Sequence, residues 1–463
     1  MHSDLTQGKI FGTLWRLALP LAGGQVMQMA YNLTDMFWLG RVSSEALAAT
    51  GAAGLFIWLS VGLMMVGRVG AEIGVSQAHG RGDLAEACKY SRTALYISGV
   101  LGVLYGAFLF LLRVQLIGFF NFREAHVAAD AITYAGIIAL SFPAMYMSGA
   151  VSGSFVASGN SRTPFLINSS GLILNMILTP IVIFPLGMGV FGAAISSVIS
   201  KYAALFIFLF AIKRFKNRPF EQFRLLPKIR PRLLFEDLRG GVANKIFRMT
   251  LPICLEQTLW PLLTLIITRI EVSFGAQALA ISRVGVQIES LSWLVGAGFG
   301  AALTAFVGQN YGAGRHDRIA SSVRYATITM LMWGTFVTAF MWFGGGVVFR
   351  IFFPEYGWNI AMRSLFITHM RIIAASQIFA NLEYVAANAF RGKGRTIPPS
   401  VAGISTNVIR VPLAFFLSRT SLGVLGVWAA ISFTYGLHGL SVAIWYLWDK
   451  RKNKEEPVLA SEA

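Results

Sequence analysis

An acidic side chain stands inside an apolar stretch of the chain, where a charge is costly. The segment MAYNLTDMFWLG (29–40) carries Asp35 near the end of an apolar run that begins around Phe11 and holds one other charge, Arg16. An ionised carboxylate at the centre of a membrane span costs about 2.5–3.5 kcal/mol on insertion scales. Burial disfavours the charged form and a nearby cation favours it. Asp35 is therefore predicted to be a switch whose charge depends on a bound cation or proton.

Two neighbours of this acid favour a site over an incidental surface charge. Asn32 and Asp35 are three residues apart and so share one face of a helix. Pro20 precedes them in the same helix and, lacking a backbone N–H, gives that helix a place to bend. The alternative is that Asp35 lies near the outer interface, where it reaches water or pairs with Arg41.

The elements that position these residues belong in a bilayer. The chain is 55% hydrophobic and 13% charged, whereas a soluble domain carries roughly 25% charged residues. Several apolar stretches exceed the roughly 20 residues that span a bilayer. The sequence thus predicts an all-α integral membrane protein with twelve transmembrane helices. Their expected ranges are 12–38, 46–72, 87–112, 127–157, 163–184, 189–213, 246–274, 278–304, 320–347, 359–389, 397–417 and 423–448.

The net charge of +18 is concentrated at every second joint between these helices. By the positive-inside rule the basic joints lie in the cytoplasm, and both termini lie there too. This topology explains the charge without nucleic acid, which is excluded as a partner. The expected location is the cell membrane, as a multi-pass protein of a bacterial inner membrane.

The chain repeats itself. SQAHGRG (76–82) matches GQNYGAG (308–314) with Gln, Gly and Gly in register, and NMILTP (175–180) matches NVIRVP (407–412). Such a duplication of six spans predicts two lobes related by a pseudo-twofold axis along the membrane normal, a geometry that transporters use for alternating access. The expected parts are an N-terminal lobe (1–213), a basic cytoplasmic linker (214–245), a C-terminal lobe (246–448) and a cytoplasmic tail (449–463).

These features resemble the multidrug and toxic compound extrusion (MATE) family. The resemblance rests on a proline-containing first helix ending in NLTDMFWLGRVSSEALAA (32–49), on the paired Gln-x-x-Gly-x-Gly loops, and on SGNSRTP (158–164) and RGKGRT (391–396). It covers essentially the whole chain, and the single Asp of the first helix suggests the DinF-like branch. It implies an efflux pump of two lobes that open as a V to one side.

The resemblance also implies partners for the first-helix acid. In that family the Asp couples to an Asn on the fifth helix, a carboxylate one turn later and a hydroxyl on the sixth. These match Asn175, Thr179 and either Ser196 or Ser197, and Thr179 cannot carry charge. Sodium prefers several hard oxygen ligands, whereas a proton needs one titrating group. Proton coupling through Asp35 is therefore expected, with sodium as the alternative.

The expected function is export of small amphipathic or cationic drugs, by the following transport cycle. A proton from outside neutralises Asp35, the first helix bends at Pro20, and the drug-binding surface of the N-terminal lobe collapses. Thioethers adapt to varied apolar ligands, although each Met could equally fill the lobe interior or face lipid. The expected substrate-binding residues are Met29, Tyr31, Asn32, Met36, Phe37, Met64, Met65, Met176 and Arg283.

The C-terminal lobe carries charges of its own. Glu256, Arg269 and Glu383 are expected to be buried there, without an assigned role. Arg283 could face the centre and pair with Asp35 in a closed state, or pair with a neighbouring Glu instead.

Three other functions are alternatives to drug efflux. A lipid-linked saccharide flippase would need a wide cationic cleft for a diphosphate. A passive channel is disfavoured, because a duplicated chain with a titratable central group suits rocking lobes better than a fixed pore. An enzyme is not expected, because no His or Cys cluster has metal-ligand spacing. No cofactor or metal is expected beyond the coupling ion, and the chain is expected to act as a monomer.

Overall fold

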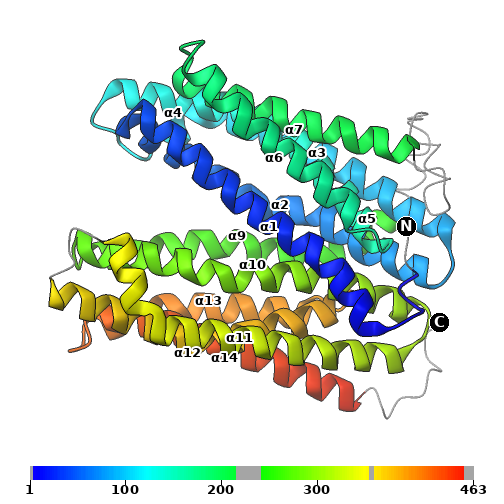
Figure 1. The fold of residues 1–463 in the computed structure, drawn as a ribbon. Helices are drawn as coiled ribbons and strands as arrows, with labels where there is room; N and C mark the ends of the chain where they lie inside the picture. The colour runs from blue at the N-terminus through cyan, green and yellow to red at the C-terminus, as the bar shows by residue number, and fades with distance from the viewer. Residues whose placement is uncertain (1–3, 215–240, 354–358, 453–463) are drawn as a thin grey trace.

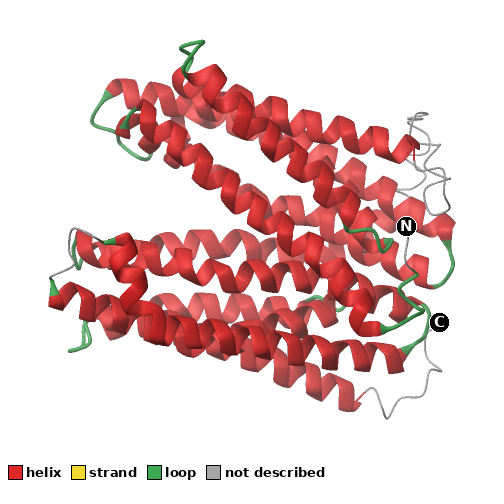
Figure 2. Cartoon of the chain, viewed as in Figure 1, coloured by secondary structure: helices red, strands yellow, loops and turns green. Residues whose placement is uncertain are grey.

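A computed structural model describes residues 4–214, 241–353 and 359–452 of the chain. The regular elements in these ranges are helices. Within these ranges no strand is present (Figure 2). The helices are α1 (Ile10–Val42), α2 (Ser44–Gly80), α3 (Leu84–Gly118), α4 (Ala125–Ile138), α5 (Phe142–Ala157), α6 (Arg162–Ile183), α7 (Gly189–Arg214), α9 (Val242–Val272), α10 (Ala276–Gly312), α11 (His316–Phe352), α12 (Ile360–Gly392), α13 (Ile397–Ser418) and α14 (Val424–Lys452).

The predicted fold class is confirmed, with one local difference. The span expected at 127–157 is split into α4 and α5 by a 3₁₀ turn, Ala139–Ser141. Pro143 in the first turn of α5 has no N–H to donate, so the α-helical bonding pattern is interrupted here. Counting α4 and α5 as one rod, the described residues form twelve rods. Eleven of these are long and apolar enough to cross a membrane; α1 is as long, but its Gln, Asn, Thr and Asp residues lower its mean hydropathy.

Two lobes form a V (Figure 1). α1–α7 form one lobe and α9–α14 the other, and they converge at the end where α1 begins and α14 ends. Across the lobes α1 packs on α10 and α2 packs on α9. Because α9 and α10 repeat α1 and α2 in the duplicated sequence, these two contacts are equivalent, as the predicted pseudo-twofold requires. The convergent end, with the loops 81–83, 158–161, 313–315 and 393–396, is called the basic end below.

Several helices extend further toward the basic end than predicted. α2 continues to Gly80 and α10 to Gly312. The last turns of both helices are polar, so the apolar runs that predicted the spans end before the helices do. α9 begins at Val242, inside the range predicted as linker. The rest of that linker and most of the predicted tail lie outside the described residues.

The segment before α1 crosses to the other lobe. Leu5 is fully buried; its backbone N–H donates to Gln309 Oε1 at 3.0 Å and its carbonyl accepts from Asn310 Nδ2 at 3.1 Å. The Arg318 guanidinium donates to the carbonyls of Gln7 and Gly8, both at 3.1 Å. Residues 5–8 thus rest on α10 and α11 before the chain enters its own lobe.

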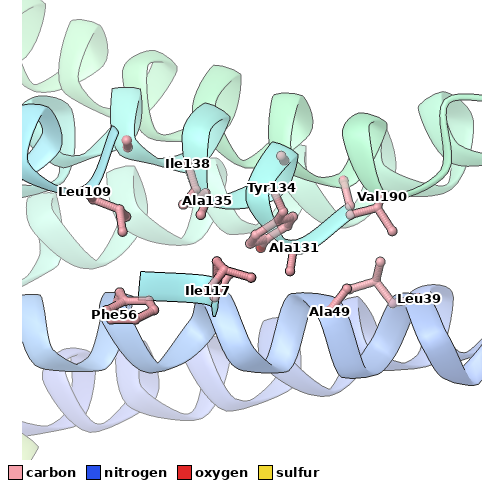
Figure 3. Packing of buried hydrophobic residues seen from close by; sticks show 14 of the residues in the cluster. Leu39, Ala49, Phe56, Leu109, Ile117, Ala131, Tyr134, Ala135, Ile138 and Val190 are labelled. Atoms are coloured by element: carbon pink, nitrogen blue, oxygen red, sulfur yellow. The ribbon is translucent and has the colours of Figure 1, made fainter. Parts of the chain in front are cut away.

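An apolar core holds α4 against α1 and α2 in the N-terminal lobe (Figure 3). Leu39 of α1, Ala49 of α2 and Tyr134 of α4 are buried together there. Small side chains such as Ala49 let membrane helices approach closely. This core fixes the half of α1 remote from the basic end, which carries Asp35, beside α4 and α7.

Candidate functional site

The carboxylate of Asp35 is only partly accessible. The side chain is half-buried on α1, and its Oδ1 atom is shielded from solvent with no hydrogen-bond partner among the described residues. Arg41, the surface partner considered from the sequence, instead lies over the Phe37 ring, 5.0 Å from its centroid. An acid with a shielded, unbonded oxygen is suited to take up a proton or cation.

A chain of hydrogen bonds lies one helical turn from this acid. The Tyr31 hydroxyl is 3.4 Å from Ser197 Oγ, and Asn175 Nδ2 donates to the same Ser197 Oγ at 3.2 Å. Thr179 Oγ1 in turn donates to Asn175 Oδ1 at 3.0 Å. Asn175, Thr179 and Ser197 are at most 2% exposed. Residues from α1, α6 and α7 that the sequence singled out are thus brought together.

Ser196 does not join this chain. Its hydroxyl donates to the Gly192 carbonyl of its own helix at 2.9 Å. Adjacent residues on a helix point about 100° apart, so only one of the two serines can face α1. Of the two hydroxyls proposed from the sequence, Ser197 has the contact with α1 and α6.

A lysine that the sequence analysis missed completes the site. Lys201 lies on α7 one turn from Ser197, and its charge interacts with that of Asp35. Its Nζ is 3.6 Å from Met145 Sδ. Within the described parts of the chain it has no carboxylate oxygen within 4.0 Å. The signal was available: Lys201 stands in the middle of the predicted span 189–213, whose other lysine, Lys213, is its last residue. A lysine in the middle of a span is itself a functional indication.

The residues expected to bind substrate are scattered. Asn32, Met36 and Phe37 are exposed on α1, and Asn32 Oδ1 accepts from Gln28 Nε2 at 3.1 Å. Met29 faces the other lobe, with its Sδ 4.0 Å from Ser290 Oγ of α10. These four therefore present a mixed polar and apolar surface on α1.

The methionines of the other helices do not extend that surface as one patch. Met64 packs against the N-terminal lobe core with Phe56, and Met65 packs at the contact of α2 with α9, beside Ile253. Met176 is half-buried on α6. Met64 and Met65 are thus primarily packing residues in this conformation.

Two arginines of the C-terminal lobe lie differently from expectation. Arg283 is exposed and its charge interacts with Glu271, the local pairing that the sequence left open; no contact with Asp35 is present among the described residues. The expectation of a buried Arg269 is wrong, because its side chain is exposed while Glu271 is buried. Two residues apart on a helix point to nearly opposite faces.

Glu256 and Glu383 are gathered in the C-terminal lobe. Glu256 is buried, its Oε2 has no hydrogen-bond partner among the described residues, and its charge interacts with Glu383, Arg391 and His438. Glu383, which was expected to be buried, is half-buried, and its charge also interacts with Arg391. The charge of Arg391 therefore balances part of the charge of both acids, and it also interacts with Glu72 of α2.

Twelve helical rods in two like lobes, with titratable groups inside each lobe, are the architecture of a two-lobed membrane transporter. The chain belongs to the MATE family: the MatE family model matches residues 20–181 and 252–416, one block in each lobe. The resemblance drawn from the sequence is thereby confirmed.

Curated relatives and solved structures agree with this assignment. The chain is 27% identical over 421 residues to a probable multidrug resistance protein NorM of Thermotoga maritima, covering 90% of this chain and 87% of that protein. It is 25% identical to the probable multidrug resistance protein YoeA of Bacillus subtilis, covering 97% of both. A crystal structure of MATE in the bent conformation matches 97% of this chain and 98% of its own, with a TM-score of 0.87 and 21% identity. An outward-facing multidrug resistance MATE family transporter of the MOP superfamily matches 98% of both chains with a TM-score of 0.84 and 21% identity.

Proposed function

We propose that this protein is a secondary active multidrug antiporter, which exports amphipathic and often cationic compounds in exchange for protons by alternating access. The relatives named as multidrug resistance proteins support the substrate class. The observation that carries the coupling is the shielded, unbonded Oδ1 of Asp35 beside the Tyr31–Ser197 contact. A proton taken up there changes the charge of the wall that a cationic substrate would face.

A proton fits this site better than sodium. Sodium binding calls for several hard oxygen ligands, and Thr179 supplies a hydroxyl where a second carboxylate would be needed. That hydroxyl donates its proton to Asn175 Oδ1 at 3.0 Å and brings no negative charge to the site. One proton moving down 100 mV supplies about 2.3 kcal/mol, and each pH unit adds about 1.4 kcal/mol. One acid therefore suffices to drive uphill export.

Bending of α1 at Pro20 is proposed to link proton uptake to release. Pro20 lies inside α1, and the next turn is closely packed on two sides. Gly298 of α10 lies directly against Ala22, and a Cβ on Gly23 would stand 3.3 Å from Phe165 of α6. A bend at Pro20 would thus shift α1 relative to both lobes at once.

The proposed orientation of the protein in the membrane is based on the distribution of its charges. The basic end and both termini are proposed to face the cytoplasm of a bacterial inner membrane, with the protein acting as a monomer. Membership of the DinF-like branch and the exact limits of linker and tail stay predictions.

Dye efflux from vesicles tests this function. Purified protein is reconstituted, and ethidium transport is measured under a pH gradient alone, a sodium gradient alone and no gradient. We expect transport under the pH gradient, its loss in Asp35→Asn, and normal transport in the control Asp317→Asn, which alters an exposed acid of α11. Unchanged transport in Asp35→Asn contradicts the coupling role, transport by sodium alone reverses the ion, and dye flux without any gradient indicates a channel.

A further inference from the structure

We infer that Lys201 is a resident counter-cation of the Asp35 site, which excludes sodium from the site and, once Asp35 is protonated, repels a cationic substrate from the lobe. This inference rests on the proposed function and names the residue that sets the ion specificity of the same site.

The position of Lys201 excludes an ordinary snorkelling lysine. It follows the first residue of α7, Gly189, by 12 residues and precedes the last, Arg214, by 13 (201 − 189 and 214 − 201). At 1.5 Å per residue it is about 18 and 20 Å from the two helix ends. A lysine side chain cannot cover that distance to reach water at either helix end, unlike Arg41 at the end of α1. A cation held there is costly unless it is compensated.

Asp35 is the group that compensates this cation. Among the described residues, the ionisable groups that interact with Asp35 are Lys201 of α7, Tyr31 of its own helix and Tyr134 of α4. α2, α6, α10 and α11, which also pack on α1, contribute no charge to it. The Lys201 ammonium has a neutral neighbour, Met145 Sδ, at 3.6 Å. With Asp35 ionised, the site is therefore neutral without any bound ion.

The separation of the two charges leaves the acid free to react. No nitrogen–oxygen distance between them is within 4.0 Å, and Asp35 Oδ1 has no hydrogen-bond partner in the described chain. A proton can attach to that oxygen directly. A sodium ion would need several ligands and would also meet a nearby positive charge, and each 1.4 kcal/mol of repulsion weakens its binding about tenfold.

The same arrangement gives the exchange its direction. When Asp35 gains a proton, Lys201 is left as the uncompensated charge of this part of the lobe. A cationic substrate that was tolerated beside a neutral pair is then repelled. Proton uptake and substrate release are thus coupled through the electrostatic field of the site, in addition to any movement of α1.

Charge replacement at residue 201 tests this inference. Lys201→Met and Lys201→Gln remove the cation, Lys201→Arg keeps it, and Lys89→Met removes an exposed lysine of α3 as a control. Ethidium binding to detergent-purified protein is measured against pH, with and without sodium chloride, after size-exclusion chromatography has verified folding. In both neutral variants we expect the half-maximal pH for ethidium release to rise by about one unit, since ionised Asp35 has lost its counter-charge. We also expect sodium to release ethidium from these variants but not from the parent, Lys201→Arg or Lys89→Met.

Neutral variants with the parental pH profile and no response to sodium overturn the role of Lys201, while loss of transport in Asp35→Asn would still support the proposed function. Transport retained in Asp35→Asn overturns the proposed function itself. If neither neutral variant folds, the parent decides: release of ethidium by sodium from the unmodified protein overturns the inference, and indifference to sodium at every pH supports it.

Discussion

The backbone of Gly80, at the end of α2, lies directly against the backbone of Gln309 on α10, so that a methyl group on Gly80 would overlap the Gln309 carbonyl. The duplicate of this contact is also present: Gly312 lies in the same way against the Gln77 carbonyl. Each copy of the Gln-x-x-Gly motif therefore packs on the other copy. Glycine is required at both positions because any Cβ would separate the backbones.

The glutamine side chains complete this contact across the lobes. Gln77 Nε2 of the N-terminal lobe donates to the Gly392 carbonyl of the other lobe at 2.9 Å. Gln309 Nε2 of the C-terminal lobe donates to the Ala157 carbonyl at 2.6 Å. The repeated motif is thus explained as a reciprocal clasp that closes the basic end.

Alanine at either glycine of the clasp is expected to weaken this closure. Gly80→Ala and Gly312→Ala should destabilise the closed basic end by about 1–3 kcal/mol, the usual cost of overpacking. Gly51→Ala in α2, where a Cβ meets nothing within 4 Å, is the matched control. Labelling of a cysteine introduced at the basic end should become faster in the first two variants only. Equal labelling in all three would show that the clasp does not close this end.

Removal of the Asn175 side chain is expected to impair coupling. Asn175→Ala breaks the bonds to both Ser197 and Thr179, and leaves buried hydroxyls unpaired at about 1–3 kcal/mol. Asn407, its duplicate in α13, provides the matched control, because it is also buried but lies in the other lobe. Proton-driven dye efflux should fall in Asn175→Ala and change less in Asn407→Ala. The reverse order would place the coupling in the C-terminal lobe.

The buried Arg410 is expected to be a stability determinant. Its Nε donates to Thr434 Oγ1 at 2.8 Å, its guanidinium lies 4.2 Å from the Tyr435 ring centroid, and its charge interacts with Glu289. Arg410→Met leaves that acid without its cation, at a cost of about 3–5 kcal/mol. Arg419→Met on the exposed end of α13 should be nearly neutral. Thermal unfolding in detergent compares the two, and equal melting temperatures would contradict this role.

Docking of the N-terminal segment is expected to weaken in acid. Burial raises the pKa of Asp4, but hydrogen bonds from Thr6 and the charges of His79 and Arg315 together hold this pKa below its ordinary value of 3.8. A carboxyl with a lowered pKa stabilises the docked form above its ordinary pKa, and the stabilisation is lost as pH falls through the lowered value. Protection of the Leu5 amide from hydrogen exchange should therefore drop at pH below about 4. Asp4→Asn should flatten this response; the same fall in Asp4→Asn would assign it to another group.

The overall architecture could be predicted from the sequence because it depends on features that extend over many residues. Apolar runs of spanning length give the rods, and the matched loops at 76–82 and 308–314 give the two lobes. The split at Ala139–Ser141 could have been expected from Pro143, which lies inside a predicted span. The family followed from motifs that fall at the ends and polar faces of helices.

The site was only partly predictable, because side-chain direction on a helix decides what meets what. Periodicity could not choose between Ser196 and Ser197, which differ by a rotation of about 100°. The error on Arg269 has the same origin, since Glu271 two residues later takes the inward face. Lys201 shows a different failure: its cost inside a span was visible, but its relation to Asp35 depends on how α7 packs beside α1.

The contact of residues 4–8 with α10 and α11 has a consequence for biosynthesis. These residues are translated well before α10 and α11, the helices on which they rest, and domains generally fold in the order of synthesis. The segment must therefore wait, undocked, while more than half of the protein is made and inserted. Its docking can report that both halves have met, so a fluorophore placed near Leu5 would time the last step of assembly.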